Sequence, residues 1–223
     1  MEIIEIAKII EYNAGKVIEH ATPNLVEPWF YLVSELDKTD VSTNQTYQKV
    51  FCQYYHLDLD KLGDDYITNY FQQLEKYKNQ VEYDIEEICV AISYAKQSDG
   101  KIHPIDYKNV SLILNLLNTQ FPIWHSRFLK MLGIAQPYFL DTAKEIRYFE
   151  KALMLIQKDI EEIIRLNLLV DALQAFDEKF PSSNISTEKK LEFLFLAFDS
   201  IHFLEVLFPE EDKILDEDSL SLN

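Results

Sequence analysis

The sequence predicts an all-α protein, an irregular multi-helix bundle of about eight to ten helices. Its 223 residues include four glycines and seven prolines, whereas a β-sandwich or barrel needs turn signals about every ten residues. Apolar residues recur instead at spacings of three and four, which is the period of an α-helix. With 48% hydrophobic and 26% charged residues, the chain has the composition of a soluble globular protein, and it is long enough for one sizeable core or two small ones.

The first half of the chain shows six helical patterns. An apolar stripe from Ile3 to Val17 ends near Pro23. Ser42 or Thr43 stands where it can cap the third helix. The six helices are expected over residues 3–17, 29–36, 43–55, 66–77, 85–94 and 104–117.

A long helical pattern occupies the second half. Residues 139–180 contain neither glycine nor proline, so they are expected to form one long helix, or one with a bend near its middle. Thr142 and Glu145 are placed to form a capping box at its start. A short helix over residues 122–133, between a proline and a glycine, is expected to precede it.

The last predicted helix follows a cap at Ser186 or Thr187. Residues 193–198 are apolar on nearly all sides of this helix, a pattern typical of a helix that is buried all round. Leu194 and Phe198 share its apolar face. Both side chains are therefore expected to lie in the main core.

The chain is expected to form a single all-α domain over residues 1–208, with residues 1–40 as a candidate N-terminal subdomain. No internal repeat or low-complexity linker divides it. Residues 209–223 contain six acidic residues against Lys213. This composition predicts an acidic, solvated tail.

The charge balance is strongly acidic. Asp and Glu number 38 against 21 Lys and Arg, which gives a net charge of -17 and an isoelectric point near 4.6. Such a surface repels phosphate backbones and anionic lipids. General nucleic-acid binding and a membrane partner are therefore disfavoured, and no apolar run approaches the roughly 18–20 residues of a membrane span.

The predicted location is the cytoplasm. The first residues carry acids where a secretory signal carries basic residues. Cys52 and Cys89 lie in apolar helical patterns, so both are expected to be reduced core residues.

The sequence predicts no catalytic residue, no cofactor and no metal site. Cys52 and His56 have the i, i+4 spacing of a nucleophile and base, but no oxyanion feature accompanies them. The acidic loop that starts at Asp58 resembles a calcium loop with Gly63 at its sixth position. It lacks the bidentate Glu, because Asn69 stands in that place.

One segment departs from the acidic background. Residues 100–133 contain Lys101, Lys108, Arg127 and Lys130 against a single acid, Asp106, a net charge of +3. Two interpretations stay open: an ordinary solvated face, or a contact surface.

This segment carries a resemblance. Its run Phe121-Pro-Ile-Trp-His-Ser-Arg-Phe-Leu-Lys-Met-Leu-Gly133 is similar to a loosely defined group of uncharacterised prokaryotic helical proteins that carry a Pro-Ile-Trp-Asp block. Residues 47–55 resemble the aromatic helix of that group, and residues 185–196 its final helix. The resemblance implies an all-helical fold and no particular activity.

A more distant resemblance is to helix-hairpin-helix DNA glycosylases, which place a catalytic Asp after a hairpin that starts with Gly and Pro. Here Gly100 and Pro104 precede Pro122, and His125 stands where the Asp would be. An imidazole cannot stabilise the developing oxocarbenium charge as a carboxylate does. The resemblance therefore implies a nucleic-acid-binding protein without glycosylase activity, in which Trp124 packs inward.

The leading functional hypothesis is a non-enzymatic binding or interaction module with a protein partner. One alternative is a degenerate glycosylase-like protein that binds nucleic acid only through residues 100–133. A second alternative is an acidic decoy or antitoxin-like partner of a basic protein. The candidate contact surface consists of Lys101, His103, Lys108, Trp124, His125, Arg127 and Lys130.

Overall fold

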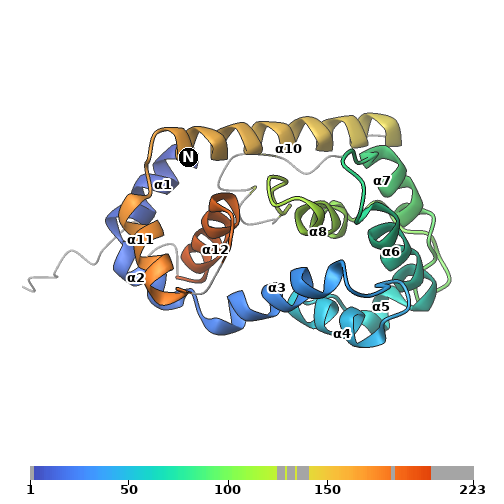
Figure 1. Cartoon of the computed structure of the whole chain (residues 1–223). Coiled ribbons are helices and arrows are strands. Elements are labelled where there is room, and N and C mark those ends of the chain that lie inside the picture. The colour runs from blue at the N-terminus through green and yellow to red at the C-terminus, as the bar shows by residue number, and fades with distance from the viewer. Residues whose placement is uncertain (1–2, 125–128, 130–133, 135–140, 182–183, 202–223) are drawn as a thin grey trace, which may run out of the picture.

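The computed structural model describes residues 3–124, 129, 134, 141–181 and 184–201. Within these ranges the chain forms eleven helices and no strand, which confirms the all-α class. A single isolated antiparallel bridge joins Lys96 and Ile102. The helices, shown in Figure 1, are α1 (Ile3–Tyr12), α2 (Ala14–His20), α3 (Pro23–Leu36), α4 (Gln45–Tyr54), α5 (Leu59–Leu62), α6 (Asp64–Tyr77), α7 (Ile85–Ser93), α8 (Tyr107–Leu117), α10 (Thr142–Arg165), α11 (Val170–Lys179) and α12 (Thr187–Ser200).

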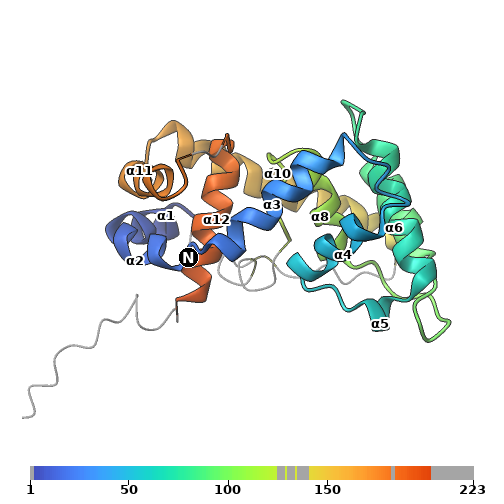
Figure 2. The same ribbon diagram turned by 60° about the horizontal axis from the view of Figure 1, so that its bottom comes forward.

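Helices α10 and α3 connect the two ends of the molecule, and α10 is the longest helix in the described residues. Figure 1 shows α10 along one side and α3 along the other, with α1, α2 and α11 at one end and α4 to α7 at the opposite end. Helix α10 contacts both α1 and α7, while α3 leads into α4 and packs against it. Helices α8 and α12 lie between the two ends, and Figure 2 shows the same arrangement from below.

The N-terminal helices α1 and α2 are joined to α11 by reciprocal helix caps. The Glu11 carboxylate accepts hydrogen bonds from the backbone N–H groups of Asp171 (2.9 Å) and Ala172 (3.1 Å) at the start of α11. In return, the Lys179 ammonium donates to the carbonyl of Ile18 (2.6 Å) in α2. The segment from residue 1 to 40 thus shares its packing with the C-terminal helices, and its status as a subdomain stays a prediction.

Among the described residues, the buried side chains form one hydrophobic cluster that extends from end to end of the molecule. Aromatic rings fill much of it. At the α4–α6 end, the Phe51 ring lies against those of Tyr70 and Phe71 at 5.6 and 5.3 Å between centroids. At the other end Phe176 stacks on Phe193 at 6.0 Å.

Several predicted helix boundaries were wrong because local caps differ from the expected ones. Asn44, not Ser42 or Thr43, caps α4 by accepting a hydrogen bond from the Tyr47 N–H. Asp141 caps α10 through the N–H groups of Ala143 and Lys144 in place of the expected capping box. Asn44 lies one or two residues after the expected cap, and Asp141 lies one residue before it. In each case a short side chain accepts from free N–H groups of the first turn.

Two predicted helices are each divided. The stripe from residue 3 to 17 is split at Asn13, whose side-chain amide donates to the Ile9 carbonyl at 2.8 Å. The long pattern over residues 139–180 is interrupted between α10 and α11, where Asn167 has a φ of 51°. Asparagine tolerates this left-handed conformation better than most residues. Together with the short helix α5 inside the expected loop, these breaks raise the helix number above the predicted eight to ten.

The last helix is as predicted. The Ser186 hydroxyl caps α12 by accepting from the Lys189 N–H. Leu194 is fully buried and Phe198 is 1% exposed. The predicted helix over residues 122–133 and the predicted tail over residues 209–223 lie largely or wholly outside the described residues.

Candidate functional site

Only part of the predicted contact surface falls within the described residues. Lys101 is exposed, and the half-buried His103 ring pairs with the Asp99 carboxylate at 3.1 Å. Lys108 is also half-buried and donates to the Tyr55 carbonyl at 3.3 Å. The remaining basic members of the set, His125, Arg127 and Lys130, lie outside the described residues.

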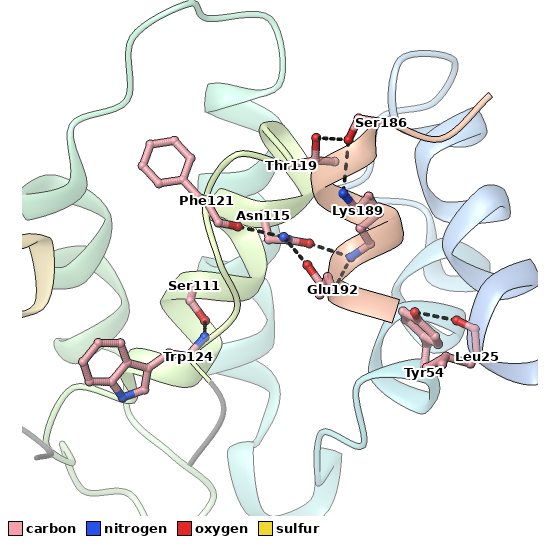
Figure 3. Close-up of polar contacts among 10 residues, drawn as sticks. All are labelled: Leu25, Tyr54, Ser111, Asn115, Thr119, Phe121, Trp124, Ser186, Lys189 and Glu192. Carbon is pink, nitrogen blue, oxygen red and sulfur yellow. Dashed lines mark hydrogen bonds and ion pairs between the residues drawn. The ribbon is translucent and has the colours of Figure 1, made fainter. Parts of the chain in front are cut away.

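Trp124 belongs to the core. It is 2% exposed, and its ring lies 5.1 Å from that of Phe149 and 6.3 Å from that of Tyr107. Its backbone N–H donates to the Ser111 hydroxyl of α8 at 2.7 Å, as Figure 3 shows. This inward packing is expected both for a glycosylase-like hairpin and for an ordinary core residue, so it does not separate the two.

The most unusual polar cluster is one that the sequence did not reveal, and it joins α8 to α12 (Figure 3). Lys189 is completely buried, and its ammonium donates to the Asn115 side-chain carbonyl at 2.8 Å and to the Glu192 carboxylate. The Asn115 amide donates in turn to Glu192 at 2.6 Å and to the Phe121 carbonyl at 2.8 Å. Every member of this cluster is therefore hydrogen-bonded.

Aromatic rings enclose the same ammonium. It lies 5.3 Å from the centroid of the Trp29 ring and 5.1 Å from that of Phe193, within the range of cation–π attraction. Burial lowers the pKa of Lys189 below its ordinary value, and the Glu192 carboxylate opposes this by favouring the charged form.

A buried lysine with a lowered pKa can serve as a nucleophile towards carbonyl groups. Here Asn115 and Glu192 accept from the ammonium, and Lys189 lines neither of the two surface hollows described below. The arrangement suits a structural link between α8 and α12 rather than a reacting group.

The two cysteines are also unsuited to nucleophilic chemistry. Both are free and buried, which confirms their predicted place in the core. Burial raises the pKa of the Cys52 thiol to about 11 and that of Cys89 to about 12. Helix α4 ends at Tyr54, so His56 is not on the helix that carries Cys52. A thiol that stays protonated at neutral pH is a poor nucleophile.

The calcium-like loop has a different structure from a metal site. Asp58 caps the short helix α5 by accepting from the Lys61 N–H. Gly63 adopts a φ of 76° between α5 and α6. In the part of the chain that the structure describes, no group of three or more His, Cys, Asp or Glu side chains could hold a metal ion.

An open groove of about 520 Å³ runs between α3 and the C-terminal end of α8; we call it the α3–α8 groove. The Thr119 hydroxyl bonds to that of Ser186 at 2.8 Å at its border (Figure 3). The residues that line the groove are Trp29, Val33, Val81, Tyr83, Leu116, Leu117, Asn118, Thr119, Asn184 and Ser186.

A second hollow of about 450 Å³ adjoins it at the turn between α6 and α7; we call it the acidic hollow. Within it the Glu87 carboxylate accepts from the Tyr77 hydroxyl at 2.7 Å and pairs with the Lys76 ammonium. These contacts lower the pKa of Glu87. The residues that line the acidic hollow are Lys76, Tyr77, Gln80, Glu82, Tyr83, Asp84 and Glu87.

Comparison with known proteins gives no further guide. Searches against protein-family models, curated proteins and solved structures find no match for this chain. None of the helices in the described ranges has both the length and the apolar character needed to cross a membrane.

Proposed function

We propose that this chain is a non-enzymatic interaction protein that binds a basic protein partner. The observation that carries the proposal is the distribution of charge between core and surface. Every Asp and Glu in the described residues keeps some exposure to solvent, while Lys189 is the one charged side chain buried among them. Burial thus removes a positive charge from a surface that already has a large excess of acids.

A strongly acidic surface acts on partners at a distance. It raises the local concentration of cationic molecules and speeds their association, and it repels anionic ones. The described part of the basic segment does little to change this, because His103 pairs with Asp99 and Lys108 donates to a backbone carbonyl. A basic protein therefore fits the charge better than a nucleic acid does.

The test begins with affinity purification of partners on the immobilised full-length chain. A partner that is recovered would then be purified, and its binding measured by calorimetry over a series of salt concentrations. We expect a partner with an excess of Lys and Arg and an affinity that falls as salt rises, because screening weakens attraction between exposed charges. An acidic partner, or binding that salt does not change, would overturn the proposal.

Labelled duplex DNA provides the second arm of the test. We expect no mobility shift at physiological salt. A shift that weakens with salt and is reduced by Arg127→Ala and Lys130→Ala would instead favour the glycosylase-like alternative.

A further inference from the structure

The α3–α8 groove leaves apolar side chains uncovered. Val81 is 94% exposed and Val33 is 37% exposed, and both line the groove beside the buried Trp29. Exposed apolar residues that share a concave surface are typical of binding sites, whereas isolated ones are common on any protein. The groove therefore suits an apolar side chain of a partner.

The Tyr83 side chain lies between this groove and the acidic hollow, and it lines both. Its hydroxyl donates to the Leu117 carbonyl at 3.3 Å, and its ring lies 5.9 Å from that of Phe121 and 6.3 Å from that of Tyr77. These contacts fix the ring in place. An apolar compartment and a charged one thus lie side by side on a preformed surface.

The charge of the hollow is negative. Glu82, Asp84 and Glu87 face a single cation, Lys76, which pairs with Glu87. Glu82 and Asp84 are both exposed. A lysine or arginine of a partner would find unneutralised carboxylate there, next to the apolar groove.

We propose that the α3–α8 groove and the acidic hollow together form a docking site for a segment of a basic protein, with an apolar side chain in the groove and a neighbouring lysine or arginine in the hollow. The inference rests on the proposed function and gives the partner a place on the surface. A second copy of this chain fits less well, because two molecules that each carry a net charge of -17 repel each other.

The probe is a capped synthetic peptide in which leucines alternate with lysines. Its two controls replace the leucines by glycine or the lysines by glutamate. Calorimetry on the unmodified full-length chain measures affinity. We expect the leucine–lysine peptide to bind at least about fivefold more tightly than either control, since loss of about 1 kcal/mol of apolar or charge contact changes affinity by about that factor.

The location of binding is tested with exposed residues whose replacement spares the fold. Val81→Ser and Glu82→Lys should each weaken binding of the leucine–lysine peptide by about fivefold. Val170→Ser makes the same replacement of an exposed valine by serine outside both hollows. Asp60→Lys likewise reverses the charge of an exposed carboxylate outside both hollows. These matched variants should stay within about twofold of the unmodified chain.

Fluorescence gives an independent readout. The chain has two tryptophans, and Trp29 lines the groove. In a Trp124→Phe variant with unchanged circular dichroism, the leucine–lysine peptide should alter the emission of Trp29, while the glycine control should not.

Three outcomes overturn the docking site. If all four surface variants weaken binding equally, the attraction is diffuse. If the peptide fails to bind while a purified basic partner does, this site is wrong and the proposed function stands. If neither the peptide nor any basic partner binds, both proposals fail.

Discussion

Lys189 is the one charged side chain that the described part of the chain buries completely. Taking an ammonium group out of water costs several kcal/mol unless it is paired and hydrogen-bonded. Asn115 and Glu192 supply that compensation, and two aromatic rings add cation–π attraction. The cluster is costly to break, because removal of one member leaves the others with unsatisfied polar groups.

Lys189→Met is expected to lower the free energy of unfolding by about 3 kcal/mol. The methionine fills similar space, but the half-enclosed Glu192 carboxylate loses its cation. Lys189→Met/Glu192→Gln should recover most of this loss, since an amide needs no counter-charge. The measurement is a double-mutant cycle by urea unfolding. It compares the unmodified chain, the two single variants Lys189→Met and Glu192→Gln, and the double variant. If Lys189→Met alone proved neutral, the carboxylate would be well solvated and the pair uncoupled.

The signals for this cluster in the sequence are weak. Three other polar residues are buried in the described chain, and all of them lie in α8: Asn109, Ser111 and Asn115. A polar residue inside an apolar helical pattern is an indication of a buried polar contact. Lys189 offered none, because a lysine beside another lysine at the start of a helix is typical of a solvated face. Asn115 and Lys189 are 74 residues apart, and helical periodicity carries no information on contacts at that range.

At the scale of helices, the type of the elements was predictable, and their number and their ends were less so. Periodicity placed the cores of α6 and α7, because their apolar faces are strongly patterned. Helix α12 was placed instead by its dense run of apolar residues after a capping serine. The apolar periodicity continues across the break at Asn167, because the buried residues of α10 and α11 keep the same spacing. The pattern therefore predicts one long helix where the structure has two. The break depends on a left-handed residue, which an apolar pattern does not record.

Gly63 is required between α5 and α6. It has a φ of 76°, and a Cβ there would lie 2.9 Å from the backbone nitrogen of Ser98. Gly63→Ala is therefore expected to cost at least about 1–3 kcal/mol of stability, because neither the backbone conformation nor the backbone neighbour can readily give way.

Gly15 is the matched control for that substitution. It lies inside α2, and nothing is within 4 Å of the position of its Cβ. Gly15→Ala should raise stability by about 0.5–1 kcal/mol, since alanine has the higher helix propensity. Thermal unfolding should show a lower midpoint for Gly63→Ala and a higher midpoint for Gly15→Ala than for the unmodified chain. A Gly63→Ala protein of unchanged stability would contradict the tight turn.

Across the whole molecule, the contact between the N-terminal helices and α11 is a cap as well as an apolar interface. A carboxylate that accepts two N–H groups at a helix N-terminus interacts favourably with the helix dipole. Glu11→Ala is expected to cost about 1–2 kcal/mol, because α11 loses both acceptors. Glu27→Ala, an exposed acid within α3, changes the charge by the same amount and should cost less than about 0.5 kcal/mol. Equal losses in the two variants would show that Glu11 acts through net charge alone.

The buried tyrosines set an alkaline limit to the fold as a whole. Full or partial burial raises the pKa of eight tyrosines in the described residues above their ordinary value near 10: Tyr47, Tyr54, Tyr55, Tyr66, Tyr70, Tyr77, Tyr83 and Tyr107. A group whose pKa is raised by folding stabilises the folded state fully below its unfolded pKa and loses that contribution as pH rises. The lowered pKa of Lys189 acts in the opposite direction, but it is one group against eight tyrosines.

The free energy of unfolding should therefore fall steeply above about pH 10, and these tyrosines should ionise together as the helices unfold. Tyrosinate absorbance and far-UV circular dichroism, recorded on the same samples, should change in one common transition. Tyr47→Phe removes one of the ionisable groups and a hydroxyl with no partner among the described residues, so its transition should move to higher pH. If these tyrosines ionised while the circular dichroism stayed constant, they would be open to solvent in the folded protein, and the aromatic core around α4 and α6 would be wrongly placed.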